Sequence, residues 1–497
     1  MASSRRDFLR GVGCTLLTRA AVCAGAERLL TMNALAGSAA TDASGYRALV
    51  CIFMFGGNDS NNVIIPYDGY GDRGGYGELR GGTGIGIPQV DLLQVAPPSA
   101  GARFGLHPAL GNQFNGSSLY DLWGQGKVSA VVNVGTLIQP ATRQDYQAGR
   151  FRPYQLFSHS DQQTEWQTSV ANSPYPTGWA GRAADVFGID PSGFPTIASL
   201  SGVTIFSSGA ATRPIVLPDS NTTLANALKL RRLTDAQSGS ALNDLLAIDS
   251  GSGAATLTRD AASVTAQAIA NSQALQQGGD VATMFPDTGL GRQLKQVARL
   301  IKLAPALGIG RQIFFCSIGG FDTHNSQNPN ANPLNFGAGQ PSLLNQVSQG
   351  MAAFYACVSG ELGVGSQVTT FTESDFSRTF KPGGQGTATG TDHAWGSHQF
   401  VMGDAVAGGN FFGTYPTLAL DGPNDADSGS GARGRWIPTT GVDQYAATLA
   451  TWFGVASSDL PTVVPNIGNF TPRDLGFMSS GAGNSTAAGI ARASRSR

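Results

Sequence analysis

Acidic and imidazole side chains gather in two short stretches of the chain. Only five histidines occur among its 497 residues. One stretch, "GGFDTH", places Asp322 two residues before His324, and the other, "TDHAWGSH", holds Asp392, His393 and His398. Mixed carboxylate and imidazole shells suit Zn, Mn or Fe, whereas an all-oxygen shell suits Ca or Mg. The two stretches therefore predict a divalent metal site, where the metal would activate a water or hydroxyl.

Four apolar runs are typical of strands that are buried on both faces, as in a parallel sheet. They occupy residues 46–59, 127–135, 311–320 and 367–375. Apolar residues recur at helical spacing over 341–362, between the last two runs, which indicates a β-α-β step. The pattern predicts an α/β fold with a doubly wound, mainly parallel central sheet.

The predicted sheet brings the acidic residues to one edge. In doubly wound sheets, sites form in the loops beyond the carboxyl ends of the strands. Asp59, Asp322 and Asp375 each come at or just after the end of one of the runs. We expect them to share one cation with His324 and the 392–398 loop. The alternative is that they only cap turns at strand ends, since Asp and Gly are frequent turn residues.

Other segments define the remaining organisation. Residues 222–307 are helical by periodicity and predict a helical insertion in a main domain that covers 46–470. Residues 478–497 are rich in Gly, Ala and Ser and predict a disordered tail.

The net charge is −1, only 13% of the residues are charged, and there is no basic run with interleaved aromatics. This composition argues against nucleic acid as a partner.

The N-terminus indicates export. Arg5 and Arg6 are followed by Phe8, Leu9 and a mildly apolar stretch, which resembles a twin-arginine export signal. We expect residues 1–36 to be this signal, the twin-arginine translocase to be a partner during export, and the mature protein to be periplasmic or secreted. No run of 18 or more apolar residues follows, so the mature chain is expected not to span a membrane.

Several longer motifs appear in a fixed order along residues 46–470. They are "MFGGNDSNNVIIPYD", "FGLHPAL", "LFSHSDQQTEWQ", "GWAGRAAD", "SIGGFDTH", "TESDFSRTF", "GTDHAWGSHQFVMGDAVAGGNFFGTYPTL" and "DQYAATLATWFGV". Together they resemble the uncharacterised, twin-arginine-exported family known as domain of unknown function 1501. That family is similar to the alkaline phosphatase and sulfatase superfamily, whose members transfer phosphoryl or sulfuryl groups.

The resemblance implies metal ligands on loops after the strands. Asp59 corresponds to the superfamily's first metal aspartate. Asp322 and His324 correspond to a later Asp-and-His segment, in which the usual spacing is wider. Asp375 stands where the superfamily has an Asp-His pair but lacks the histidine, which "TDHAWGSH" is expected to supply. The sulfatase signature C-x-P-x-R is absent from the sequence, which argues against a formylglycine-type sulfatase.

The resemblance also implies catalytic residues. The nucleophile should open a helix after an early strand, where the helix N-terminus stabilises an anion. "FSHSDQQTEW" offers Ser158 and the neighbouring His159 as candidates, while Ser160 is interpreted as a helix cap. Arg378 is a candidate for binding a substrate oxyanion, with a structural ion pair as its alternative.

These observations lead to two hypotheses about function. The first is an exported metal-dependent hydrolase that acts on a small anionic phosphate or sulfate ester. The second is a non-catalytic exported protein that retains the fold and works in the envelope or in surface binding.

Overall fold

The structure is a computed structural model that describes residues 45–188, 190, 193–228 and 256–479. The expected export signal at residues 1–36 lies outside the described residues. So do all but the first two residues of the expected tail at 478–497.

A nine-stranded sheet forms the centre of the described chain, in the order β11-β5-β10-β9-β1-β8-β6-β7, with β12 paired to β5. The long strand β1 pairs in parallel with both β8 and β9, whereas β10 is antiparallel to its two neighbours β5 and β9. The strands are β1 (Arg47–Met54), β5 (Val128–Gly135), β6 (Ile197–Ser199), β7 (Ile215–Val216), β8 (Arg311–Ile318), β9 (Val368–Ser374), β10 (Ser397–Met402), β11 (Phe411–Phe412) and β12 (Thr440–Gly441).

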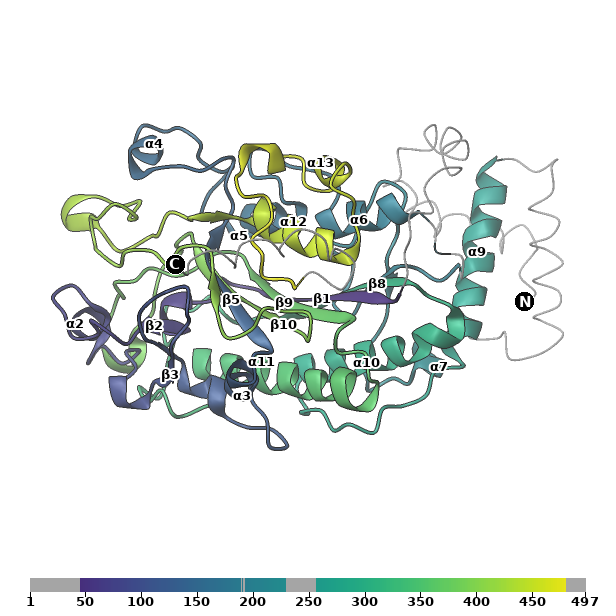
Figure 1. The fold of residues 1–497 in the computed structure, drawn as a ribbon, viewed down its shortest axis with the longest axis horizontal. Helices are drawn as coiled ribbons and strands as arrows, with labels where there is room; N and C mark the ends of the chain where they lie inside the picture. Colours follow the sequence, from purple (N-terminus) through teal and green to yellow (C-terminus); the bar gives the residue numbers. More distant parts are fainter. Residues whose placement is uncertain (1–44, 189, 191–192, 229–255, 480–497) are drawn as a thin grey trace, which may run out of the picture. The chain divides into compact units, whose positions relative to one another are not determined.

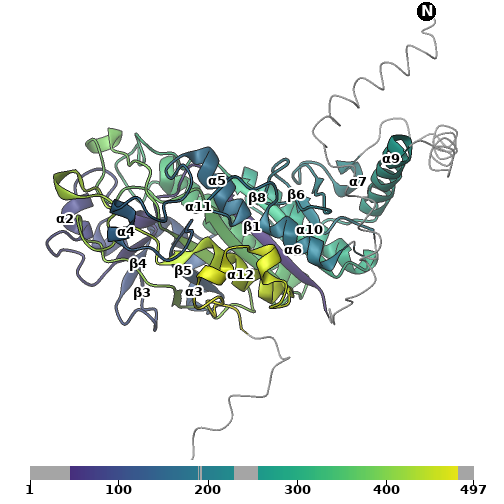
Figure 2. The same cartoon turned by 90° about the horizontal axis from the view of Figure 1, so that it is seen from above.

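Helices cover both faces of this sheet, so the predicted α/β, mainly parallel fold is confirmed (Figure 1). One face carries α3 (Leu119–Gly124), α10 (Gly289–Leu307) and α11 (Gly339–Tyr355). The opposite face carries α5 (His159–Thr168), α6 (Trp179–Phe187), α12 (Val442–Phe453) and α13 (Leu460–Val463). Figure 2 shows α5, α6 and α12 in front of the sheet when it is seen from above.

The composition of β1 explains its central position. Its residues alternate between the two cores, because successive side chains of a strand point to opposite faces. Val50 and Ile52 pack in the core with α10 and α11, whereas Cys51 and Phe53 pack in the core with α6 and α12. A continuous apolar run is therefore buried on both sides, which is the arrangement expected for a central parallel strand.

One part of the chain differs from the expected organisation. The predicted loop at 392–398 ends in β10, which lies between β5 and β9 in the sheet. The six residues of "SHQFVM", three polar and three apolar, are all buried within the sheet. The motif "TDHAWGSH" thus runs from a loop into the sheet itself.

The expected insertion at 222–307 is largely helical where it is described, with a non-helical segment at 276–288. It contains α7 (Leu224–Ala227), α9 (Thr256–Leu275) and α10, and residues 229–255 lie outside the described residues. A separate three-stranded sheet consists of β2 (Ile64–Pro66), β3 (Leu93–Val95) and β4 (Phe104–Leu106). The chain also forms the short helices α2 (Tyr76–Arg80) and α4 (Arg143–Gln147).

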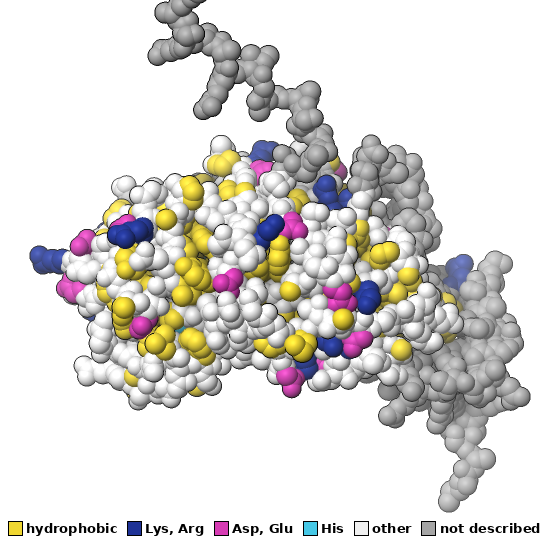
Figure 3. All heavy atoms as spheres, turned by 60° about the horizontal axis from the view of Figure 1, so that its bottom comes forward, with side chains coloured by type: hydrophobic (Ala, Val, Ile, Leu, Met, Phe, Trp, Pro, Cys, Tyr) yellow, Lys and Arg dark blue, Asp and Glu magenta, His cyan; other side chains and the backbone are white. Residues whose placement is uncertain are grey.

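The surface carries few charges. On the described part of the face in Figure 3, lysines and arginines are scattered, and several lie beside acidic side chains. Among the described residues, none of the helices combines the length and apolar character needed to cross a membrane.

Candidate metal centre

His159 is held at the end of the sheet by a buried acid. It is the first residue of α5, and its Nδ1 lies 2.7 Å from Oδ2 of Asp375, which follows β9 and has no solvent exposure. The same carboxylate accepts hydrogen bonds from Gln163 Nε2 at 2.8 Å and from the backbone N–H of Gly56 at 3.2 Å. Asp375 therefore fixes the ring of His159 and directs its Nε2 away from the sheet.

Two further imidazoles are anchored in the same way. Nδ1 of His324 lies 3.0 Å from Oδ1 of Asp392, and Nδ1 of His393 lies 2.7 Å from the carbonyl oxygen of Phe157. An acceptor at Nδ1 orients a ring and sets its tautomer, and metal-binding histidines commonly have such partners. In all three rings Nε2 is left facing the centre of the cluster.

The three Nε2 atoms converge on one carboxylate oxygen. Oδ1 of Asp322 lies 3.4 Å from His159, 3.1 Å from His324 and 3.4 Å from His393. Nε2 of His324 and Nε2 of His393 are 2.9 Å apart. Four ligands about 2.0–2.1 Å from one metal in a tetrahedron lie about 3.3 Å from one another. These four separations are close to that edge length, and the ligand atoms that all lie within 4.8 Å of one another come from His159, Asp322 and His393.

The tautomers give a second argument for a cation. The carbonyl of Phe157 can only accept, so Nδ1 of His393 carries the proton and Nε2 of the neutral ring carries a lone pair. When Nδ1 of His324 donates to Asp392, its Nε2 also presents a lone pair, directed at that of His393. His159 Nε2 is buried and has no hydrogen-bond partner. A cation among these nitrogens would satisfy all three, so the donor set fits a metal.

Electrostatics within the cluster keep its acid ionised. Partial burial raises the pKa of Asp322, but the hydrogen bond and charge of Arg378 outweigh it, so the pKa is lowered overall. The hydrogen bond to Asp375 raises the pKa of His159, whereas partial burial and the charge of Arg378 lower the pKa of His324. A deprotonated acid and neutral imidazoles are the forms that bind metals, so the pKa shifts of Asp322 and His324 favour metal binding and that of His159 opposes it.

Arg378 lies directly behind the cluster. Its buried guanidinium donates from Nη1 to Oδ1 of Asp322 at 2.8 Å, and from Nη2 to the carbonyl of Thr391 at 2.5 Å. Nη1 also lies 3.3 Å from the carbonyl oxygen of Gly56. Most of its donors are used within the protein. In this structure Arg378 therefore holds Asp322 in place, which corresponds to the ion-pair alternative.

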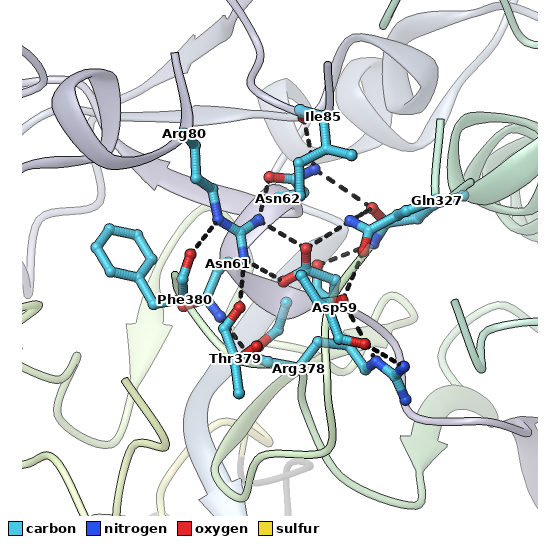
Figure 4. Close-up of polar contacts among 12 residues, drawn as sticks. Asp59, Asn61, Asn62, Arg80, Ile85, Gln327, Arg378, Thr379 and Phe380 are labelled. Atoms are coloured by element: carbon cyan, nitrogen blue, oxygen red, sulfur yellow. Dashed lines mark hydrogen bonds and ion pairs between the residues drawn. The ribbon is translucent and has the colours of Figure 1, made fainter. Parts of the chain in front are cut away.

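Asp59 has different partners. Arg80 donates to both of its oxygens, at 2.6 and 3.1 Å, and Nε2 of Gln327 donates at 2.6 Å (Figure 4). The side chains of Asp59 and Arg80 are fully buried. The carboxylate is thus neutralised inside the protein, and we leave Asp59 out of the ligand set proposed below.

Two other residues singled out in the sequence have contacts elsewhere. His398 lies in β10, where its Nδ1 accepts a hydrogen bond from the backbone N–H of Asn133 at 3.0 Å and its ring packs on Tyr415. Burial lowers the pKa of His398 to about 3. Ser158 occupies the N-cap position of α5, so the interpretation of Ser160 as the helix cap is wrong, since Ser160 lies inside the helix. The hydroxyl of Ser158 donates to Oδ2 of Asp161 at 2.6 Å.

The structure therefore groups His159, Asp322, His324 and His393, with Asp375 and Asp392 behind the rings. His159, Asp322 and His393 offer ligand atoms that lie within 4.8 Å of one another. Sequence analysis did not identify the carbonyl of Phe157 or the amide of Gln163. A backbone carbonyl leaves no signal in a sequence, and Gln163 is marked only by its position one helical turn after His159.

A comparison with protein families decides the affiliation of this chain. The model of a family described as "Protein of unknown function (DUF1501)" matches residues 46–426. The chain belongs to the DUF1501 family. All four grouped residues of this DUF1501 protein lie within the matched range. None of the curated proteins matches it. Among solved structures, it is similar to the PsFucS1 sulfatase from Pseudoalteromonas sp., with 11% identity and a TM-score of 0.31, over 88% of this chain and 72% of that one.

Proposed function

We propose that this protein is an exported, metal-dependent hydrolase of phosphate or sulfate esters. The observation that carries the proposal is the convergence of three imidazole nitrogens on Oδ1 of Asp322, with each ring anchored at Nδ1. A nitrogen-rich donor set favours Zn, Mn or Fe over Ca or Mg, which prefer oxygen.

Each residue has a defined part in this proposal. His159, His324, His393 and Asp322 hold the cation, which when bound supplies a Lewis acid and a water of lowered pKa. The residues behind them set the direction of the rings, and Arg378 keeps the carboxylate of Asp322 ionised.

The cluster is accessible to a substrate. The side chains of His324 and Asp322 are 42% and 45% exposed, so an ester can approach from solvent. Ser158 lies beside His159 and is the candidate nucleophile. Its hydrogen bond to Asp161 gives its hydroxyl proton an acceptor, which is one requirement for an activated nucleophile.

Metal content and turnover test the proposal together. Purified protein should contain Zn, Mn or Fe at close to one ion per chain by elemental analysis. It should hydrolyse an aryl phosphate, a phosphodiester or an aryl sulfate, and a chelator should abolish the activity. Protein that binds no divalent cation under any loading condition would contradict the proposal.

The second candidate function is a non-catalytic, exported envelope protein. The observation that favours it is the position of Ser158 at the N-terminus of α5, where a hydroxyl bonded to Asp161 also suits a helix start. Stoichiometric metal together with no turnover of any tested ester would favour this candidate over the hydrolase.

Export is a separate part of the proposal and rests on the Arg5–Arg6 pair. Because the export machinery reads this pair, replacing both residues by Lys should leave the precursor in the cytoplasm. Fractionation of cells that express the wild type and the double variant measures this. Equal delivery of both proteins to the periplasm would contradict export by this route.

A further inference from the structure

A buried polar network connects Asp59 to the metal centre. Oδ2 of Asp59 accepts from Nε2 of Gln327 at 2.6 Å, and Oε1 of Gln327 accepts from the hydroxyl of Thr391 at 2.6 Å. The same hydroxyl lies 3.4 Å from Nε of Arg378, whose Nη1 donates to Asp322. Apart from Asp322, every side chain in this series is buried.

The same network holds the backbone of the segment that carries Arg378. Arg80 donates to the carbonyl oxygens of Thr379 and Phe380 at 2.9 and 2.7 Å, and Nδ2 of Asn61 donates to the carbonyl oxygen of Arg378 at 2.8 Å (Figure 4). Both the main chain and the side chain of this arginine are thus held by buried hydrogen-bond partners.

The network also reaches the loop that carries an imidazole. The N–H of Thr379 donates to the carbonyl oxygen of Asp392 at 2.9 Å, and the hydroxyl of Thr379 accepts from the N–H of Asp392 at 3.1 Å. Arg378 and His393 form a β-bridge between the same two segments. A shift of the 378–380 segment would therefore displace Asp322 and His393 together.

We infer that Gln327 and Thr391 are positioning residues that set the ligand geometry of the metal centre through Arg378. The inference rests on the proposed function. The hydroxyl of Thr391 is shared by Gln327 and Arg378, whereas the other contact of Arg378 with this residue is to its carbonyl oxygen, which a substitution of the side chain leaves in place. A buried network of this kind is rigid only when every member is satisfied.

The test is binding of cobalt(II), whose visible spectrum reports the geometry of its ligands. Thr391→Val should weaken cobalt binding at least tenfold and alter the visible bands, because it removes the shared hydroxyl and little else. Thr391→Ser retains a hydroxyl and should restore both the affinity and the spectrum. Recovery of the wild-type cobalt spectrum by Thr391→Ser would show that the hydroxyl oxygen, and not the overall stability of the fold, sets the ligand geometry.

Thr372 provides a matched control. It is also a buried threonine whose hydroxyl has two partners within the sheet: it donates to Gln399 Oε1 at 2.8 Å and accepts from the N–H of Phe400 at 2.9 Å. Among the described residues, this hydroxyl makes no hydrogen bond to the network. Thr372→Val should leave cobalt affinity and spectrum unchanged. Gln327→Met breaks the same chain of contacts one step earlier and should reproduce the effect of Thr391→Val, so the inference does not depend on one variant folding.

The cobalt experiment distinguishes a failure of the proposed metal centre from a failure of the positioning role. If the wild type binds no cobalt, the proposed metal centre is wrong and the inference falls with it. If the wild type binds cobalt and the Thr391→Val and Gln327→Met variants match it in affinity and spectrum, the metal centre stands and the positioning role is refuted.

Discussion

Nδ1 of His159 lies 2.7 Å from an oxygen of Asp375 that is inaccessible to solvent. This contact joins the first turn of α5 to the end of β9. It fixes which nitrogen of His159 carries the proton, and it leaves Nε2 as the atom available to a metal.

Asp375→Asn should weaken metal binding by about 10–100-fold, the usual range when a partner behind a ligand is lost. An amide in this position would donate to Nδ1 and move the ring proton to Nε2, which blocks the ligand atom. Equilibrium dialysis against zinc measures the effect. Asp421→Asn, at an exposed ion pair with Arg143, should bind zinc as the wild type does.

His393→Ala should abolish stoichiometric metal, because it removes one of the four converging ligand atoms. His107 offers the control: it is buried, and its Nδ1 only accepts from the N–H of Ala109 at a helix start. His107→Asn keeps an acceptor suited to that position and should leave the metal content unchanged. Equal loss of metal in both variants would mean that elemental analysis is reporting misfolding rather than ligation.

Arg80→Met should lower the free energy of unfolding by about 3–5 kcal/mol, since it leaves the carboxylate of Asp59 buried without its partner. Asp59→Asn should cost a similar amount, and the double variant should cost less than the two single costs added together. Denaturant unfolding measures all three. Should Asp59→Asn instead remove metal without loss of stability, Asp59 would be a ligand after all.

Gly56→Ala should disturb the metal centre, and Gly45→Ala should not. Both glycines have positive φ, +113° and +119°, so the backbone strain of an alanine is similar at the two positions. At Gly56 a Cβ would lie 2.3 Å from the backbone nitrogen of Asp322, whereas at Gly45 it would meet nothing within 4 Å. We expect weaker metal binding only for Gly56→Ala, and identical affinities for the two variants would contradict this account of the site.

Buried acids away from the metal centre should make the protein less stable as the pH rises. Burial raises the pKa of Asp443 to about 8 and that of Glu165 to about 9. Between the ordinary values near 4 and these raised values, the folded chain holds protons that the unfolded chain has released. The stabilising protonated form is therefore fully present below about pH 4, and its contribution is lost as the pH rises through 8 to 9.

Asp443→Asn should flatten this dependence. Each such group contributes a slope of up to about 1.4 kcal/mol per pH unit inside its window, and the amide does not titrate. Urea unfolding at intervals from pH 5 to pH 9 measures the slope. A variant whose slope equals that of the wild type would show that Asp443 is ionised in the folded protein.

The sheet could be predicted from the sequence because its central strands are apolar on both faces. Residues 46–59 were expected to form a strand, and β1 covers Arg47–Met54. β10 was not foreseen, because "TDHAWGSH" contains glycine and polar residues, and the apolar residues of the strand, Phe400–Met402, come only after this motif. Its antiparallel pairing depends on β5 and β9, which no local pattern reveals.

The candidate site could be predicted only as a collection of residues. An acid after a strand suggests a ligand whether or not another side chain neutralises it. The partner of Asp59 is Arg80, the last residue of α2, which the sequence does not connect with it. The roles of Asp322, which faces the imidazoles, and Asp392, which lies behind His324, depend on distances that the sequence does not contain. Sequence spacing predicted candidate metal ligands, whereas tertiary contacts decide which of these side chains lie together and which lie behind another.

The parallel pairing of β1 has a consequence for the newly synthesised chain. Ala48 is paired with Gln312 on one side and with Val368 on the other, which is 320 residues further along the chain. At about 5–20 residues per second, translation leaves the most apolar strand without its second neighbour for roughly 15–60 s. Such a strand aggregates readily, and non-local pairing is slow to form even when both strands are present. We therefore expect the nascent chain to need shielding from solvent until β9 has emerged.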